Sequence, residues 1–119
     1  MLYYIMEEKE EILFENIKEY WKNALLADRN KEYNTAVVLF FKAISALADL
    51  YLLKKEGNIP NSHTDRFRIL EKKYREIYKI LDKDFPFYQD SYRAKLDLET
   101  SEILKKDAKR LSEITGIEL

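Results

Sequence analysis

The chain of 119 residues has no cysteine, one histidine, two glycines and two prolines. The absence of cysteine excludes disulfides, thiol catalysis and metal sites built on thiolates. A single histidine also excludes the usual imidazole-based metal sites and catalytic triads, so we expect no metal and no cofactor. Glycine and proline are too scarce for the many turns of a β-sandwich or β-barrel. These absences favour a helical protein.

Neither sign of charge dominates the sequence. The 21 Lys and Arg residues are balanced by 22 Asp and Glu residues, which gives a net charge of −1. This balance excludes a polybasic nucleic-acid-binding tail and an acidic disordered chain. The length and the 46% of hydrophobic residues suit one domain, residues 1–119. The charged content of 36% without cysteine is typical of a thermophile protein.

Long uninterrupted apolar runs are also missing. The most apolar stretch, residues 36–53, is interrupted by Lys42 and Asp49 and is shorter than the ~20 residues of a membrane span. The apolar residues 1–6 have no basic start, and glutamates follow at once, so we expect no secretory signal. The sequence therefore predicts a cytoplasmic protein without membrane contact.

The spacing of apolar residues predicts helices over residues 6–27, 31–55, 62–84, 87–96 and 101–115. The second helix is apolar on nearly every side, so other helices or a second copy of the chain should surround it. We expect Pro86 to end the third helix, and Thr100 or Ser101 to cap the last one. Because the connections are short, the fold is predicted to be all-α, an antiparallel up-and-down four-helix bundle with a short fifth C-terminal helix.

Four basic residues of the predicted third helix fall on one face opposite its apolar stripe. They are Arg68, Lys72, Arg75 and Lys79. Such a basic ridge can follow a phosphate backbone. The alternative is a solvated face that complements the acidic first helix, and the net charge of the chain favours this alternative.

The predicted second helix carries a narrow polar stripe of Lys42, Ser45 and Asp49. Charge on a buried helix needs a partner or a watery groove. Asp49 paired with Arg93 or with a neighbouring chain is the structural interpretation. A polar groove is the functional one, and it makes Lys42 and Asp49 candidates for ligand or partner binding.

Tyr88, Tyr92 and Arg93 form a second candidate for ligand or partner binding. Their spacing of i, i+4 and i+5 places two phenols and a guanidinium in one polar-edged patch of the predicted fourth helix. Ordinary packing between helices is the alternative interpretation. Arg93 is expected to contribute to binding and not to folding, because it lies beside the apolar stripe of its helix.

Several short segments follow one another in a distinctive order. They are residues 33–36 (YNTA), 43–47 (AISAL), 52–57 (LLKKEG), 61–63 (NSH), 92–94 (YRA) and 107–111 (DAKRL). Over about residues 33–114 this order resembles the HEPN domain (higher eukaryotes and prokaryotes nucleotide-binding). The resemblance implies a helical bundle that often dimerises. Many members of that family act beside a minimal nucleotidyltransferase in toxin–antitoxin or defence operons, and others are metal-independent RNases.

The RNase members of that family carry an arginine, a polar residue and, shortly after, a histidine. Arg93 occupies the matching place, but Leu98, Glu99 and Thr100 stand where the histidine would be needed. The only histidine, His63, precedes Arg93 in the chain. Without an imidazole at that place, RNA cleavage loses its usual proton carrier. The resemblance therefore supports the fold and argues against nuclease activity.

Three functions follow from these observations. The first is a non-catalytic HEPN-like module, homodimeric, that binds a protein partner such as a minimal nucleotidyltransferase, or a nucleotide or RNA. The second is a divergent HEPN RNase of a toxin–antitoxin or defence system, with a site around Arg93, Tyr92 and Asp49. The third is a helical assembly protein with no ligand. We favour the first over an enzyme.

Overall fold

The structure is a computed structural model that describes residues 2–119, with side chains from Glu8 onward. Five helices make up this part of the chain: α1 (Leu2–Arg29), α2 (Tyr33–Glu56), α3 (His63–Lys73), α4 (Arg75–Asp90) and α5 (Leu98–Thr115). The described residues contain no strand, which confirms the predicted all-α class. The helices form a bundle, and α5, the last of them, is shorter than α1 and α2.

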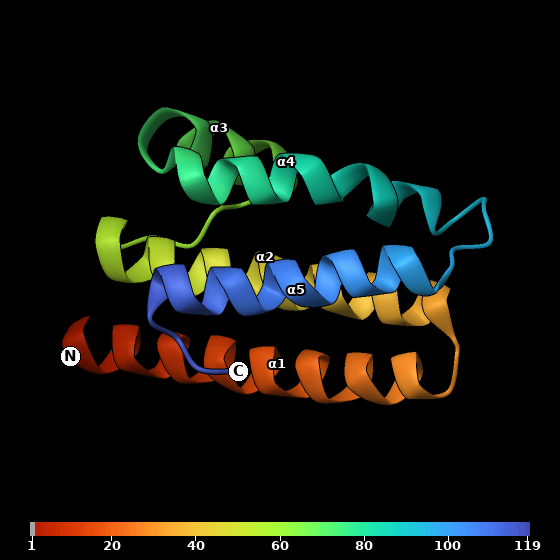
Figure 1. Ribbon diagram of the computed structural model, residues 1–119. Coiled ribbons are helices and arrows are strands. Elements are labelled where there is room, and N and C mark those ends of the chain that lie inside the picture. Colours follow the sequence, from red (N-terminus) through yellow and green to blue (C-terminus); the bar gives the residue numbers. More distant parts are fainter. Residues whose placement is uncertain (1) are drawn as a thin grey trace.

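Helix α2 lies at the centre of the bundle, as its composition predicts. It packs against α1, α5 and α4, while α3 and α4 together form a helical hairpin above it (Figure 1). By length and composition α2 could cross a membrane, but most of it is buried inside the bundle. The helix is thus the core of a compact bundle, an arrangement consistent with a soluble protein.

Two apolar clusters fill the space around α2. The first is mainly aliphatic and joins α2 to α1, α4 and α5 through Ile17, Ile44, Leu47, Leu81 and Leu111. The second is rich in aromatic rings and joins the first half of α2 to α1 and α5 through Val37, Phe40, Phe41, Ala24 and Leu104. Burial of these side chains is the main stabilising term of the fold.

The chain reverses direction at Tyr74, where the sequence predicts an uninterrupted helix over residues 62–84. Tyr74 adopts φ −135° and ψ 66°, outside the helical region, and α4 folds back along α3. The ring of Phe67 in α3 consequently lies 5.3 Å from the ring of Phe85 in α4. The prediction of one continuous helix is wrong because Tyr74 is fixed by α2: its hydroxyl donates to Glu56, and its ring packs edge-on at 5.4 Å from Tyr51.

Proline does not end a helix here, contrary to the sequence-based expectation. Helix α4 continues through Pro86 to Asp90. A proline inside a helix removes one N–H donor, and the neighbouring rings of Phe85 and Phe87 pack against the second apolar cluster. Tertiary packing on both sides of Pro86 therefore maintains the helix.

The connection between α4 and α5 is held by Asn34 at the start of α2. The Asn34 amide nitrogen donates to the carbonyl oxygens of Ser91 (3.0 Å) and Ala94 (2.7 Å), and its oxygen accepts from the Leu96 N–H (3.0 Å). The predicted helix over residues 87–96 is therefore replaced by a turn after Asp90.

The caps of the helices follow the sequence in part. Ser62, the first residue of the predicted third helix, caps α3, since its hydroxyl accepts from the Asp65 N–H at 3.1 Å. The cap of α5 is Asp97, which accepts from the Thr100 N–H at 3.0 Å, instead of the expected Thr100 or Ser101. The Ser101 hydroxyl is buried and donates to Asp28 of α1 at 2.6 Å.

Candidate anion-binding site

The polar stripe of α2 faces the start of α3. Asp49 and Arg66 form a bidentate ion pair, with Nε 2.7 Å from Oδ1 and Nη2 2.8 Å from Oδ2. Both side chains are only 11% exposed. Two parallel hydrogen bonds fix the plane of the guanidinium, so Arg66 is rigidly held. Arg93, expected as a partner of Asp49, is not that partner.

His63 extends this pair by one hydrogen bond. Its Nδ1 lies 2.8 Å from Nη1 of Arg66. Arginine only donates hydrogen bonds, so Nδ1 is the acceptor and the proton of the neutral ring resides on Nε2. Burial and the charge of Arg66 lower the pKa of His63, which is therefore neutral at neutral pH. The free edge of the ring presents an N–H donor and no lone pair.

An aromatic wall lies beside His63. The ring of Tyr88 stacks on Phe41 at 4.9 Å and lies 6.1 Å from the His63 ring. The hydroxyl of Tyr88 is 3.3 Å from that of Tyr92, whose residue is 75% exposed. This hydrogen bond raises the pKa of Tyr92. Tyr92 thus presents a ring to solvent from a base of packed aromatic residues.

Lys42 completes the group from the first half of α2. Its Nζ lies 6.0 Å from the centre of the Tyr20 ring. The pKa of His63 is lowered by burial, by the charge of Arg66 and, more weakly, by the charge of Lys42, and the same lysine weakly opposes the rise that the Tyr88 hydroxyl causes in the pKa of Tyr92. Lys42 is therefore electrostatically coupled to both residues.

We call this group the polar cluster. Its members, from α2, α3, α4 and the turn after α4, are Lys42, Asp49, His63, Arg66, Tyr88 and Tyr92. The cluster combines two permanent cations, an imidazole N–H and phenol hydroxyls with a single carboxylate that is already paired. Such a set of donors is suited to an anionic ligand.

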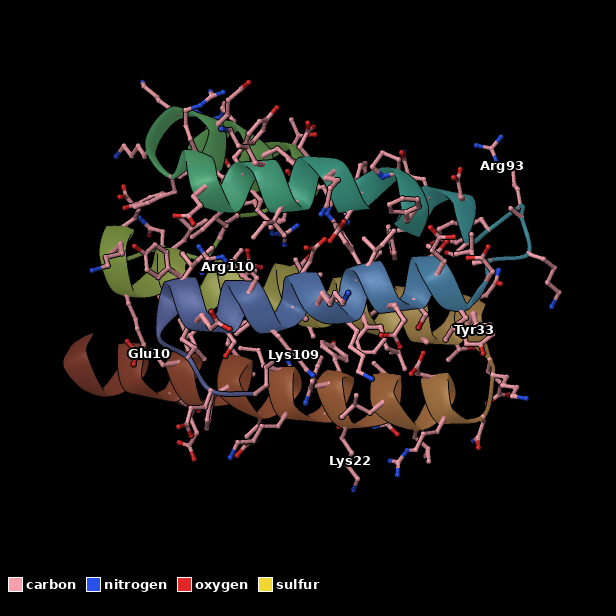
Figure 2. The ribbon with its side chains drawn as sticks, viewed as in Figure 1. Glu10, Lys22, Tyr33, Arg93, Lys109 and Arg110 are labelled. Carbon is pink, nitrogen blue, oxygen red and sulfur yellow. The ribbon has the colours of Figure 1, made fainter. Side chains whose placement is uncertain are left out.

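Four of the five predicted binding residues belong to the cluster, in which Asp49 and Tyr92 are joined only through Arg66, His63 and Tyr88: they are Lys42, Asp49, Tyr88 and Tyr92. Arg93 does not. It lies in the turn after α4 that Asn34 holds, and Figure 2 shows its side chain pointing away from the bundle. Asp49 is about 22 Å farther along α2 from Asn34, at about 1.5 Å per residue. The predicted RNase site of Arg93, Tyr92 and Asp49 is therefore not assembled.

His63 and Arg66 are the residues that the sequence did not assign to the site. A signal was present, because a carboxylate on the most apolar helix requires a cation. Arg66 lies in the first turn after the Ser62 cap, three residues beyond His63. Sequence alone could not choose it over the other basic residues, because the choice depends on how the α3–α4 hairpin folds onto α2.

The predicted basic ridge is divided by the reversal at Tyr74. Arg68 and Lys72 belong to α3, whereas Arg75 and Lys79 belong to α4. Arg68 pairs with Asp65 at 2.6 Å, and the Arg75 guanidinium lies 5.7 Å from the Tyr78 ring. The prediction of one continuous ridge is wrong, since its spacing assumed a single helix.

A second group of acids is buried between α4 and α5. Asp84 is fully buried, and no N–H or hydroxyl donor among the described residues reaches either of its oxygens, so its hydrogen-bonding neighbour is another carboxyl group, Asp107. Burial and the neighbouring Asp107 raise the pKa of Asp84 to about 9. Asp107 is itself 2.8 Å from the Lys83 ammonium. Asp84 is thus a protonated acid inside the bundle, and it lines none of the described cavities.

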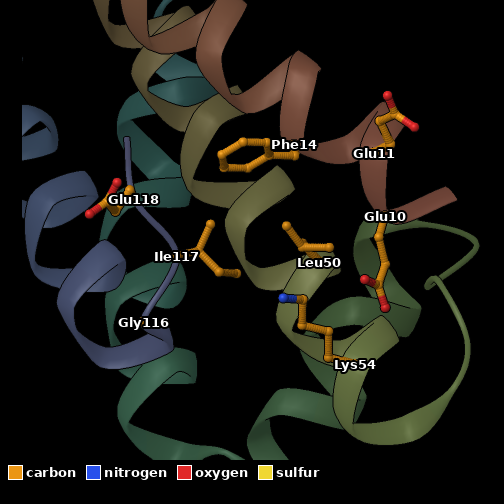
Figure 3. Close-up of a pocket in the computed structure, with 8 residues that line it drawn as sticks. All are labelled: Glu10, Glu11, Phe14, Leu50, Lys54, Gly116, Ile117 and Glu118. Carbon is orange, nitrogen blue, oxygen red and sulfur yellow. The ribbon is translucent and has the colours of Figure 1, made fainter. Parts of the chain in front are cut away.

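The largest of the described cavities is an open trough of about 620 Å³ between α1, α2 and the C-terminal segment (Figure 3). It is lined by Glu10, Glu11, Phe14, Leu50, Lys54, Gly116, Ile117 and Glu118. Its charged groups lie at the surface, and within the described side chains no buried unpaired polar group faces it. The trough therefore offers less specific chemistry than the polar cluster.

Among the side chains described from Glu8 onward, no three of the His, Asp and Glu residues gather where a metal ion could bind. Comparisons of the chain with models of protein families, with curated proteins and with solved structures find no match.

Proposed function

We propose that the protein is a cytoplasmic, non-catalytic HEPN-like module that binds a nucleotide or RNA through the polar cluster. The observation that carries this proposal is the contact between Arg66 Nη1 and His63 Nδ1 at 2.8 Å. It turns the outward edge of the imidazole into a donor beside Lys42. Ammonium, guanidinium and imidazole N–H groups together suit phosphate oxygens.

The tyrosines of the cluster supply the second half of nucleotide recognition. Tyr92 is 75% exposed, and its ring packs edge-on against Tyr88 at 5.9 Å. Stacking of a base on such an exposed ring contributes about 1–3 kcal/mol and tolerates any base. A phosphate on the cations and a base on Tyr92 would together occupy one face of the protein.

The same geometry supports binding without cleavage. Metal-independent cleavage of RNA needs a proton acceptor near the attacking hydroxyl. The lone pair of His63 is engaged by Arg66, and Asp49 is engaged by the same guanidinium. The cluster therefore contains donors in place of a free base, and a binding module is favoured over the alternative of a divergent RNase.

Exposed apolar residues support an assembly role beside this binding. Leu26 at the end of α1 and Tyr92 and Leu98 at the α4–α5 connection are exposed, and these parts of the chain meet at one end of the bundle (Figure 1). We propose that this end, with Arg93, contacts a second copy of the chain or a protein partner such as a minimal nucleotidyltransferase. Light scattering that gives a monomer mass at micromolar concentration would contradict the homodimer.

Fluorescence anisotropy with a labelled single-stranded RNA, in EDTA, tests the binding function. We expect Lys42→Gln and Tyr92→Ala each to weaken binding about tenfold, as for the loss of one charge-assisted contact or one stacked base. Lys22→Gln is the matched control, because Lys22 is exposed and projects from α1 away from the other helices (Figure 2). Equal affinities of the Lys42 and Lys22 variants would refute the site. Cleavage of the RNA that His63→Gln abolishes would instead establish the RNase.

A further inference from the structure

A small open cavity adjoins the polar cluster between α1, α2 and α3. Its volume is about 190 Å³, and it is lined by Leu13, Asn16, Tyr20, Lys42, Ser45, Ala46, Asp49 and Arg66. The polar stripe of α2 thus forms one wall of this cavity.

Ser45 is the residue of this wall that indicates that the cavity binds a ligand. It is only 8% exposed, and its hydroxyl has no hydrogen-bond partner among the described residues. A serine inside a helix can donate to the carbonyl four residues earlier, but this hydroxyl does not. A buried hydroxyl without a partner is costly, so one that faces a cavity indicates a ligand or an ordered water there.

The charges around Ser45 select the kind of ligand. Lys42 and Arg66 are cations, and Asp49 is the only acid among the described residues that line the cavity. Asp49 uses Nε and one N–H of Nη2, and His63 uses one N–H of Nη1. A guanidinium has five N–H donors, so Arg66 retains two for a further acceptor. The cavity is therefore net positive and rich in donors.

The volume of the cavity narrows the choice of ligand further. Pockets for drug-sized ligands occupy about 300–1,000 Å³, so a cavity of about 190 Å³ is too small for a nucleoside. A single tetrahedral oxyanion has one central atom and four acceptor oxygens, and it fits such a space. Its oxygens would accept from the Ser45 hydroxyl, the Lys42 ammonium and the free N–H groups of Arg66.

We propose that this cavity binds the terminal phosphate group of a nucleotide or RNA end, with Ser45, Lys42 and Arg66 as donors. The inference rests on the proposed function and makes it more specific. A terminal phosphate carries close to two negative charges and three free oxygens, whereas a phosphate inside an RNA chain carries one charge and two. The cavity should therefore distinguish chain ends from chain interiors.

The test compares one RNA oligomer with a 5′-phosphate, a 3′-phosphate or hydroxyls at both ends, by anisotropy. We expect one phosphorylated form to bind at least tenfold more tightly than the form with two hydroxyl ends. Ser45→Ala should reduce this preference to less than threefold and leave the affinity for the hydroxyl form unchanged. Alanine is a good helix former and removes a hydroxyl without a partner, so the variant should fold normally. Thr35→Ala, on the exposed face of α2, is the matched control.

A titration with inorganic phosphate, followed by NMR of the backbone amides, separates the two proposals. Shifts of the amides around Ser45 that Ser45→Ala abolishes support the cavity even if no RNA binds, and in that case the proposed function fails alone. RNA binding without any preference for a terminal phosphate overturns the cavity and leaves the proposed function intact. The absence of both phosphate shifts and RNA binding overturns both.

Discussion

Two buried aspartates of this protein lie in opposite surroundings. Asp49 on α2 shares two hydrogen bonds with Arg66 and lies next to an open cavity. Asp84 on α4 lies between α4 and α5, where no cation, N–H or hydroxyl donor of the described residues reaches it and its hydrogen-bonding neighbour is another carboxyl group, Asp107. Asp49 therefore holds the guanidinium of Arg66 in place, whereas Asp84 takes up a proton.

The difference shows why burial alone does not identify a functional acid. A carboxylate keeps its charge inside a protein when a guanidinium satisfies it, and the guanidinium then becomes a fixed group at the surface. A carboxyl group without such a partner becomes neutral and behaves as a small polar part of the core. Of the two aspartates, only Asp49 organises residues that a ligand can reach.

The strongest test of this comparison introduces a buried carboxylate with no partner. Phe41 is 1% exposed and packs at the centre of the aromatic cluster. We expect Phe41→Asp to cost more than about 4 kcal/mol, and so to unfold the protein, because it removes a core ring and buries an unpaired charge. Circular dichroism checks this, with Glu11→Ala on the exposed face of α1 as the control. Equal melting temperatures for the two variants would contradict the helix assignment.

The next test removes the partner of Asp49. Arg66→Met leaves that carboxylate buried without its two hydrogen bonds, and we expect a loss of about 3–5 kcal/mol of unfolding free energy in urea titrations. The double variant Asp49→Leu with Arg66→Met should recover most of this loss, because no isolated charge remains. Additive losses for the two substitutions would show that the ion pair is not what links these residues.

A third test concerns the proton on Asp84. Its pKa is raised from 3.8 to about 9, so the folded state binds one proton more than the unfolded state between these values. Stability should therefore fall as pH rises through this window, by up to about 1.4 kcal/mol per pH unit. Asp84→Asn should remove this slope and raise the unfolding free energy at pH 8 by several kcal/mol.

The control for that experiment is Asp82→Asn, two residues away on the exposed side of α4. It should keep the slope of the unmodified protein in urea titrations over pH 5–9. A pH profile that Asp84→Asn leaves unchanged would mean that Asp84 is ionised in the folded protein.

The smallest expected effect is that of Arg93→Ala. Arg93 is exposed in the turn after α4 and makes no ion pair among the described residues. We expect an unchanged melting temperature and unchanged RNA affinity, with any defect confined to self-association or binding of a protein partner. A tenfold loss of RNA affinity would extend the polar cluster to this end of the bundle.

Much of the fold could be predicted because it depends on local pattern. The apolar composition of residues 31–55 indicates a central helix, and Gly57 and Gly116 end helices in the left-handed conformation that glycine tolerates. The reversal at Tyr74 could not be predicted, because the residues around it carry no glycine or proline. Its cause is a hydrogen bond to Glu56, distant along the chain.

The polar cluster, like the fold, could be predicted only where it depends on local sequence. The position of Lys42 and Asp49 on an otherwise apolar helix is a signal within one segment of sequence. The contribution of His63 and Arg66 depends on the direction of α3, which follows from the reversal at Tyr74. The family resemblance directed attention to Arg93, which the structure places at the other end of α2 from Asp49.

The reversal at Tyr74 has a consequence for how two copies of this chain could exchange helices. The helical hydrogen bonds from Tyr74 to Leu70 and from Tyr78 to Tyr74 are both present, so the backbone on either side is already helical. Only the rotation at Tyr74, fixed by Glu56 and Tyr51, separates α3 and α4 from one continuous helix. In such a straightened helix, α4 would leave its own bundle and could pack on α2 of a second copy. Tyr74 is thus the hinge at which a domain-swapped dimer of this protein would form.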